Sequence, residues 1–114
     1  MEGHKYCLLV SYRKNGAPVP TPVWFGMAGG NVYTRTAAED WKVKRIRNNP
    51  RVLVGPCTVR GKPRGPLAEG RARVVGTGEE DAAEAALQSN YGLGRRLYEA
   101  RASYEAVYLE VAPA

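Results

Sequence analysis

The stretch YCLLVSYRKNGAPVPTPVWFGM, residues 6–27, decides the fold. Tyr6 to Arg13 contains enough β-branched and aromatic residues to predict a strand. Asn15-Gly16, the strongest short signal for a β-hairpin, follows it, and a second strand is predicted from Pro18 to Met27. Prolines at positions 18, 20 and 22 cannot donate backbone hydrogen bonds. We therefore expect the first half of the second strand at a sheet edge or in a bulged, ligand-facing stretch.

Four further strands are predicted from short apolar runs between turn residues. Gly29-Gly30 turns the chain into a strand over 32–36, and Val52-Leu53-Val54 marks a strand over 51–59 that suits burial on both faces. A basic hairpin tip at 60–65 leads to a strand over 67–75, and a last strand covers 106–111. This succession predicts a mainly β protein, a small antiparallel barrel or sandwich with helices, in which residues 1–114 form one domain.

Two helices are predicted between the strands. The first runs from about residue 38 to residue 48 and ends before Pro50, with Thr36 and Glu39 at capping-box spacing. The second begins after Gly78, with Thr77 and Glu80 as its capping box. It is alanine-rich through residue 87, breaks near 90–94 and resumes over 95–102.

The composition excludes several classes of protein. The chain has 114 residues, of which 44% are hydrophobic and 25% charged, as in ordinary globular domains. No apolar run approaches a membrane span and no secretion signal is evident, so we expect a cytoplasmic protein with no membrane partner. Two cysteines, Cys7 and Cys57, and one histidine, His4, argue against a disulfide framework, a metal site or a His-based triad.

Positive charge is concentrated in residues 35–64. The chain holds 17 Lys and Arg against 11 Asp and Glu, which gives a net charge of +6. The segment 35–64 holds nine basic and two acidic residues, so it carries +7 and the remainder −1. Such a focused field indicates an anionic partner, either nucleic acid or a small ligand with phosphates or carboxylates. A solvated basic face is the other interpretation.

Two stretches are candidates for ligand binding. Residues 34–36, Thr-Arg-Thr, end a strand, and Lys42 lies in the first turns of the next helix, so hydroxyls, cations and helix N–H groups would converge on a phosphate. A solvent-facing helix with incidental basic residues is the alternative. In Pro20-Thr-Pro-Val-Trp-Phe25 the prolines leave backbone groups free for the edge of a flat heterocycle, with Trp24 as a wall, although Trp24 and Phe25 also suit a core.

Taken together, TPVWF at 21–25, VYTRT at 32–36 and KVKRIRNNPRV at 42–52 resemble the pyridoxamine 5′-phosphate oxidase-like flavin and deazaflavin proteins. The chain is most similar to their small coenzyme F420-dependent oxidoreductases. GPCTVRGKPRG at 55–65 and EGRARV at 69–74 extend the resemblance, which covers about residues 6–111. It implies a six-stranded antiparallel split β-barrel, and a homodimer with two cofactor sites at its interface.

The resemblance also implies an activity and cofactor-binding residues. The expected function is an oxidoreductase that transfers a hydride between F420 and an unsaturated small organic substrate, and no catalytic side chain is nominated. The residues implied are Thr21, Pro22, Val23 and Trp24 for the ring and ribityl part, Thr34, Arg35, Thr36 and Lys42 for the phosphate, and Arg47, Arg60, Lys62 and Arg64 for the oligoglutamate tail.

Four alternatives stay open. An FMN-dependent oxidoreductase of the same fold is the first, but FMN lacks the tail that would explain the +7 segment. Trp41 also stands where FMN-binding relatives often have a basic residue. The second is a cofactor-binding module without turnover, and the third keeps the fold but has lost the site. The fourth is a nucleic-acid binder, which is not expected because Trp41 is the single aromatic residue between 35 and 64 and stacking platforms would be scarce.

Overall fold

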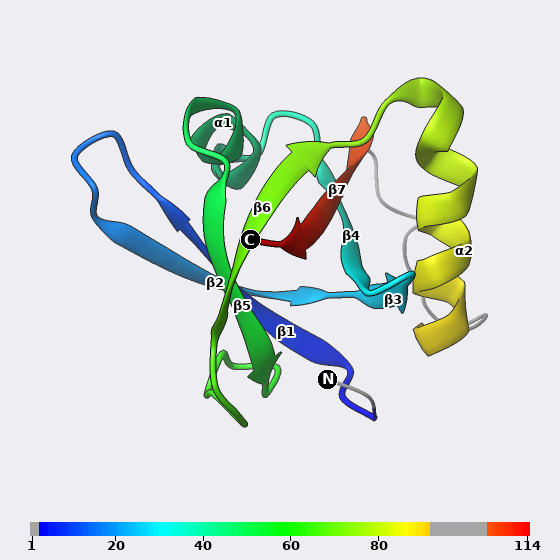
Figure 1. The fold of residues 1–114 in the computed structure, drawn as a ribbon, viewed down its shortest axis with the longest axis horizontal. Helices are drawn as coiled ribbons and strands as arrows, with labels where there is room; N and C mark the ends of the chain where they lie inside the picture. The colour runs from blue at the N-terminus through cyan, green and yellow to red at the C-terminus, as the bar shows by residue number, and fades with distance from the viewer. Residues whose placement is uncertain (1–2, 92–104) are drawn as a thin grey trace.

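The computed structural model describes residues 3–91 and 105–114, which form a curled β-sheet with two α-helices (Figure 1). The strands in this part of the chain are β1 Tyr6–Tyr12, β2 Pro18–Trp24, β3 Gly26–Ala28, β4 Asn31–Ala37, β5 Arg51–Cys57, β6 Ala68–Val74 and β7 Ala106–Pro113. The helices are α1 Trp41–Asn48 and α2 Glu80–Tyr91, and a short 3₁₀ turn, η1 Thr77–Glu79, precedes α2. The mainly β class expected from the sequence is confirmed.

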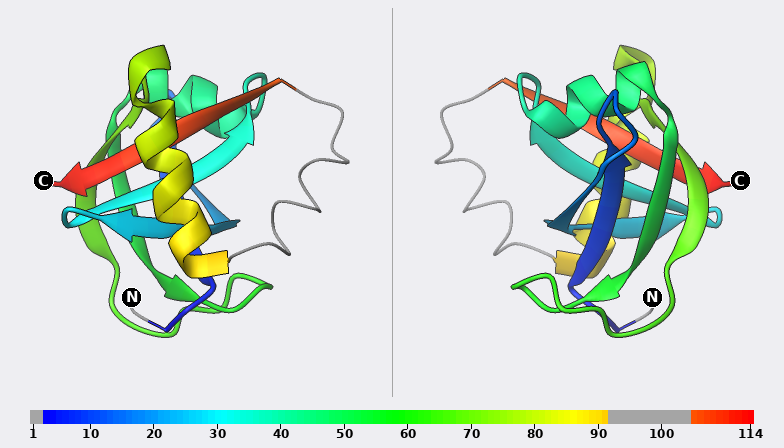
Figure 2. Two further views of the ribbon diagram at one scale, coloured as in Figure 1. Left: turned by 90° about the vertical axis from the view of Figure 1, so that its right-hand side faces the viewer. Right: turned by 90° about the vertical axis from the view of Figure 1, so that its left-hand side faces the viewer.

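The sheet curls because its two edge strands are consecutive in the chain. The strand order is β2-β1-β5-β6-β7-β4-β3, and every pairing is antiparallel. A single residue, Phe25, separates β2 from β3, so the outermost strands must approach each other. Figure 2 shows the resulting half-barrel, with α2 standing along one side and α1 covering one end.

Residues 3–91 and 105–114 form seven strands rather than the six predicted, because the predicted strand over 18–27 is split in two. β2 pairs with β1 and β3 pairs with β4, and the buried Phe25 marks the change of partner. Gly26 then lies directly against α2, where a Cβ atom would be 2.0 Å from the backbone oxygen of Ala86. The sequence pattern of the two short strands is continuous, so nothing local reveals the break.

The β1–β2 hairpin forms as predicted. The amide of Gly16 donates to the oxygen of Arg13 at 2.8 Å, and Gly16 has a φ of +87°, which glycine adopts readily. The amide of Arg13 donates to the oxygen of Ala17 at 2.9 Å. Hydrogen-bonded pairs alternate along an antiparallel ladder, so the pairs containing Pro18, Pro20 and Pro22 exchange no hydrogen bonds. These prolines therefore fit an edge strand, as predicted, and their carbonyls face away from β1.

Both helices start differently from their predicted capping boxes. Asp40, not Thr36, caps α1, because its side chain accepts a hydrogen bond from the amide of Lys42 at 3.0 Å while Thr36 belongs to β4. Asp is as good an N-cap as Thr or better, and it lies closer to the helix. Before α2, the carboxylate of Glu79 accepts from the amide of Gly76 at 3.3 Å. The predicted helix over 95–102 lies outside the described residues, and α2 continues through Asn90 and Tyr91.

The core has two parts, one on each face of β1 and β5. Inside the barrel, Cys7 and Leu9 pack with Val52 and Val54. On the other face, Leu8, Val10 and Cys57 form a smaller cluster, against which Leu53 packs. The interior strand β5 thus packs on both faces, as its unbroken apolar run predicted, with Leu53 on the outer face only partly buried. Among residues 3–91 and 105–114, no helix has the length and apolar character needed to cross a membrane.

Candidate functional site

The strand–helix corner between β4 and α1 holds a buried lysine. Lys42, in the first turn of α1, is 7% exposed. Its ammonium donates to the hydroxyl of Thr36, at the end of β4, across 2.9 Å. It also forms an ion pair with Asp40 at 3.0 Å. A buried ammonium needs such partners, because removing a charge from water is costly when nothing compensates it.

Asp40 is the residue of this corner that the sequence analysis missed. Burial opposes ionisation of Asp40, but hydrogen bonds from the amide and the ammonium of Lys42 hold its pKa below the ordinary 3.8. The carboxylate is therefore ionised at neutral pH and neutralises Lys42. The local signal was present, since an Asp immediately before an apolar-periodic run is a typical N-cap.

The three consecutive residues of β4 that were predicted to bind phosphate do not lie together. Thr34 and Thr36 are buried on one face of the strand, and Arg35 projects from the other, as strand alternation requires. Thr34 is 2% exposed, and its hydroxyl donates to the backbone oxygen of Trp24 at 2.6 Å. In this structure Thr36 and Lys42 form the corner, and Thr34 joins β4 to β2.

The predicted ring-contacting segment, Thr21 to Trp24, forms the second half of edge strand β2. The alternation that places the carbonyls of Pro20 and Pro22 outward also places that of Trp24 outward, and this last carbonyl is the one that Thr34 binds. Thr21 and Val23 are half-buried on the face opposite the prolines. The free edge of β2 thus presents a row of backbone carbonyl acceptors, and its prolines offer no N–H donors. The row ends at Trp24, whose carbonyl is bound by Thr34 of the strand that leads into the corner.

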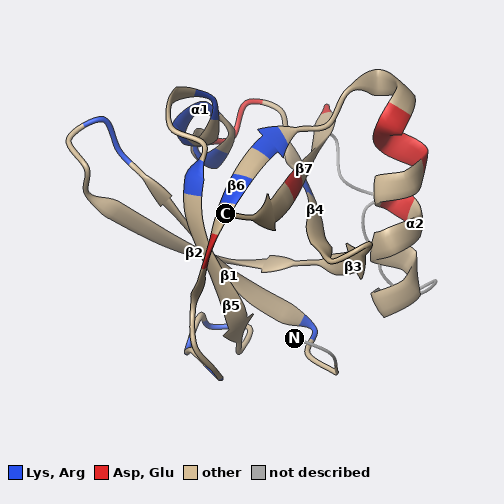
Figure 3. Cartoon of the chain, in the orientation of Figure 1, with Lys and Arg blue, Asp and Glu red and all other residues tan. Residues whose placement is uncertain are grey.

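The arginines predicted to bind the oligoglutamate tail of the cofactor lie far apart in the structure. Arg47 is exposed on α1, and Arg64 is exposed in the loop between β5 and β6. These elements adjoin opposite ends of β5, whose seven residues span about 20 Å (Figure 3). The +7 segment is therefore divided between the two ends of the molecule. Arg60 and Lys62 lie with Arg64, while Lys44 and Arg45 lie with Arg47.

Both cysteines lie in the core of the described part of the chain. Burial raises the pKa of the Cys7 thiol to about 12 and raises that of Cys57 as well, so both thiols are protonated at neutral pH. Residues 3–91 and 105–114 contain no group of three His, Cys, Asp or Glu side chains that could hold a metal ion.

Three solved structures share the fold across nearly the whole chain. A Listeria innocua protein proposed to be a pyridoxamine 5′-phosphate oxidase is 21% identical, with a TM-score of 0.71 over 98% of this chain and 86% of its own. An FAD-binding protein from Mesorhizobium loti is 16% identical, with a TM-score of 0.72 over 98% and 83%. A heme storage protein from Vibrio cholerae is 12% identical, with a TM-score of 0.75 over 99% and 84%. At these identities the similarity establishes the fold.

The family follows from the sequence itself. No curated protein matches the chain. The family model described as pyridoxamine 5′-phosphate oxidase, however, matches residues 1–114. The chain therefore belongs to the pyridoxamine 5′-phosphate oxidase family.

Proposed function

We propose that the protein binds the deazaflavin coenzyme F420 and transfers a hydride to or from an unsaturated small organic substrate. One observation carries this proposal: the buried ammonium of Lys42 lies 2.9 Å from the hydroxyl of Thr36, at the strand–helix corner of a chain from this family. An ammonium and a hydroxyl are suitable partners for a phosphate. The FAD-binding relative from Mesorhizobium loti supports a flavin-type cofactor.

The row of outward carbonyls on β2 suits the other end of such a cofactor. Carbonyls of Pro20 and Pro22 would accept hydrogen bonds from ring N–H groups, and Trp24 would shield the ring from water. When bound, the deazaflavin ring supplies the hydride chemistry. The residues of the chain bind the phosphate, orient the ring and exclude solvent. Arg47, on the helix that carries Lys42, would meet the anionic tail, and Arg64 would do so from the other end of β5.

Asp40 provides the sharpest test of the phosphate site. A phosphate at Lys42 must compete with the Asp40 carboxylate, 3.0 Å from the ammonium. Asp40→Asn removes this charge but retains an N-cap that is as good for α1. We therefore expect Asp40→Asn to bind F420 up to about fivefold more tightly than the parent, since an ion pair with a partly exposed carboxylate is worth up to about 1 kcal/mol.

The experiment is a spectral titration of the parent and three variants with F420 and, separately, with FMN. Lys42→Gln should weaken binding about tenfold or more, because it removes the cation that faces the phosphate. Arg71→Gln removes an exposed cation on β6, away from the corner, and should leave binding unchanged. Thermal unfolding of each variant checks that the fold is retained. If neither cofactor binds, or if Lys42→Gln and Arg71→Gln behave alike, the proposal is refuted.

The same titration separates the alternatives of this fold. Tight binding of FMN without binding of F420 would identify an FMN-dependent oxidoreductase. Binding of F420 without oxidation of its reduced form by any of a panel of enones and quinones would favour a cofactor-binding module. Hydride transfer to a member of the panel would support the enzyme.

We also propose that the protein works as a homodimer. An apolar groove of about 360 Å³ includes Met27, Pro66 and Val111 in its lining, and Met27 is 42% exposed. A second copy covering this groove would remove apolar surface from water. Sedimentation at low micromolar concentration should give a dimer, and a monomer would contradict the proposal.

A further inference from the structure

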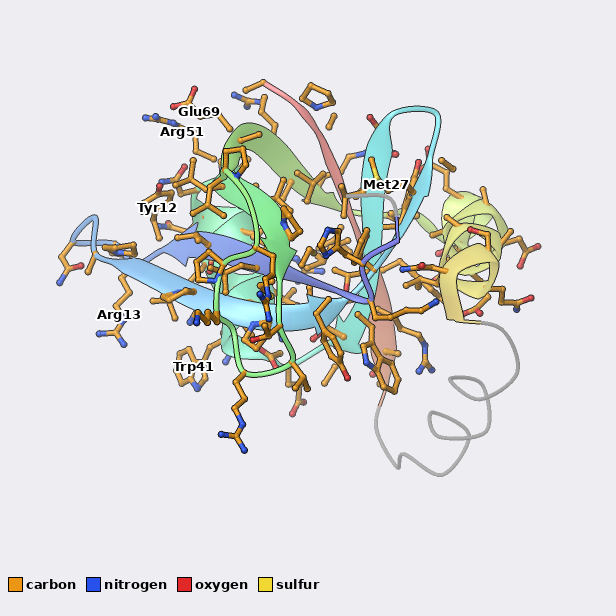
Figure 4. All side chains as sticks on the ribbon, turned by 90° about the horizontal axis from the view of Figure 1, so that it is seen from below. Tyr12, Arg13, Met27, Trp41, Arg51 and Glu69 are labelled. Carbon is orange, nitrogen blue, oxygen red and sulfur yellow. The ribbon has the colours of Figure 1, made fainter. Side chains whose placement is uncertain are left out.

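A cleft lies between the β1–β2 hairpin and helix α1. It has a volume of about 470 Å³, which is within the range of small-ligand pockets. We call it the hairpin–helix cleft. One wall consists of Tyr12, Arg13 and Lys14, and the other includes Trp41, Lys44 and Arg45. Figure 4 shows Tyr12, Arg13 and Trp41 gathered at the same end of the molecule.

The helical wall is a single stripe of α1. Residues 41, 44, 45 and 48 recur at the spacing of one helix face, and all four line the cleft. Lys42, Val43 and Ile46 point into the protein instead. The cleft and the lysine of the proposed cofactor site therefore use different faces of the same helix, so the two sites can be altered separately.

The cleft is strongly cationic. Its lining includes four basic side chains, on Arg13, Lys14, Lys44 and Arg45, and no Asp or Glu. Within the described ranges, no carboxylate lies at ion-pairing distance from any of these four. Asp40, which lies outside the lining, interacts electrostatically with Arg45, but the four converging cations outnumber it and favour an anionic ligand.

The walls of the cleft are aromatic as well as basic, and they are tied together. Trp41 is 69% exposed, although tryptophan is a residue that proteins usually bury, and the ammonium of Lys44 lies 4.5 Å from its ring centroid. Tyr12 contributes a second ring from the other wall. Arg45 spans the two walls, since its Nε donates to the hydroxyl of the buried Ser11 at 2.7 Å. Among residues 3–91 and 105–114 this is the one hydrogen bond made by the side chain of Arg45, which also lines the cleft.

We infer that the hairpin–helix cleft binds an aromatic ring that carries a phosphate, of the chemical class of a nucleotide. The exposed indole offers a stacking surface, and the guanidinium and ammonium groups pair with phosphate oxygens. A free nucleotide and a nucleotide within a single strand share this chemistry. The inference does not rest on the proposed oxidoreductase activity, because it involves neither Lys42 nor the β2 edge.

The test is calorimetric titration of the purified protein with AMP, adenosine and inorganic phosphate at low ionic strength. AMP should bind about tenfold or more tightly than either half of the molecule alone, because ring and phosphate contacts act together. Trp41→Ala should weaken AMP binding about tenfold by removing the stacking surface. The double variant Lys14→Gln/Lys44→Gln should weaken it by a similar factor and flatten its dependence on salt.

Matched controls make the result decisive. Arg71→Gln removes one exposed cation outside the cleft and should leave AMP affinity within about twofold of the parent. Trp41 and both lysines are exposed, so their substitution should not disturb folding, and thermal unfolding of each variant checks this. If AMP shows no saturable binding at millimolar concentration, or binds Trp41→Ala as tightly as the parent, the inference is overturned.

A further titration with an oligoadenylate of about eight nucleotides distinguishes the two sources of the ligand. Tighter binding of the strand than of AMP, with a steeper salt dependence, identifies a single-stranded nucleic acid. Equal or weaker binding of the strand identifies a free nucleotide. Because Lys42→Gln is the decisive variant for the cofactor site and Trp41→Ala for this cleft, either proposal can fail without the other.

Discussion

The hydroxyl of Thr34 donates a hydrogen bond to the backbone oxygen of Trp24 at 2.6 Å, and this bond joins β4 to the free edge of β2. β2 is one edge of the sheet, and β4 lies next to the other edge strand, β3, so β1, β5, β6 and β7 separate the two strands in the sheet order. Where β3 stops pairing with β4, a side chain therefore takes over the closure that a backbone ladder would make in a complete barrel.

Replacing Thr34 by valine tests this closure. Thr34→Val retains the shape of the side chain but removes its hydrogen bond to the Trp24 carbonyl, so we expect a loss of about 1–3 kcal/mol in the free energy of unfolding, measured in urea. Thr21→Val, on half-buried strand β2, is the control and should cost less than about 0.5 kcal/mol. Equal effects of the two substitutions would show that the Thr34 bond does not close the barrel.

The contact between Gly26 and helix α2 gives a second prediction. A Cβ atom at Gly26 would lie 2.0 Å from the oxygen and 2.3 Å from the carbonyl carbon of Ala86, both of which are backbone atoms that cannot rotate away. We expect Gly26→Ala to destabilise the protein by about 3 kcal/mol or more, seen as a lower Tm. Gly78→Ala, where a Cβ meets nothing within 4 Å, should leave the Tm almost unchanged.

The loss of folding stability at acid pH should be due in part to Glu110. Its carboxylate accepts from the Tyr33 hydroxyl at 2.7 Å and from Arg73 Nε at 3.0 Å. The bond from Tyr33, and then Arg73, hold the pKa of Glu110 below its ordinary value although burial opposes ionisation. A carboxyl whose pKa is lowered by folding contributes stability above its unfolded pKa, and this contribution is lost as the pH falls through the folded pKa.

Glu110→Gln should therefore lower stability at neutral pH and flatten the loss of stability below about pH 4.5. Urea unfolding at a series of pH values measures both effects. Glu105→Gln, at the exposed residue before β7, is the control and should leave the shape of the curve unchanged. Parallel curves for the parent and Glu110→Gln would contradict the prediction.

The two cysteines should be unreactive in the folded protein. Because burial raises the pKa of Cys7 to about 12, very little of this thiol is ionised at pH 8. Labelling with iodoacetamide at pH 8 should leave Cys7 and the buried Cys57 unmodified in buffer and modify both in guanidinium chloride. Rapid labelling of native Cys7 would show that the first strand opens readily.

Much of the fold could be predicted from local sequence. The Asn15-Gly16 turn, the edge character that three prolines impose on β2, and the two-sided burial of β5 depend on neighbouring residues alone, and each is confirmed. The break at Phe25 was not predictable, because it is caused by a change of strand partner and by the approach of α2 to Gly26. Asp40 was overlooked as the cap of α1 although its position in the sequence suffices to identify it.

The sequence by itself determined which segments become strands, where the chain turns, and that positive charge is concentrated in the middle of the chain, because these properties depend on residue type and short-range spacing. The tertiary structure alone decided how that charge is distributed. It divides residues 35–64 between the two ends of β5 and brings Tyr12, Arg13 and Lys14 to Trp41 from a hairpin that precedes the charged segment. The physical reason is that antiparallel pairing and the curl of the sheet set distances between side chains far apart in sequence, and no local pattern contains those distances.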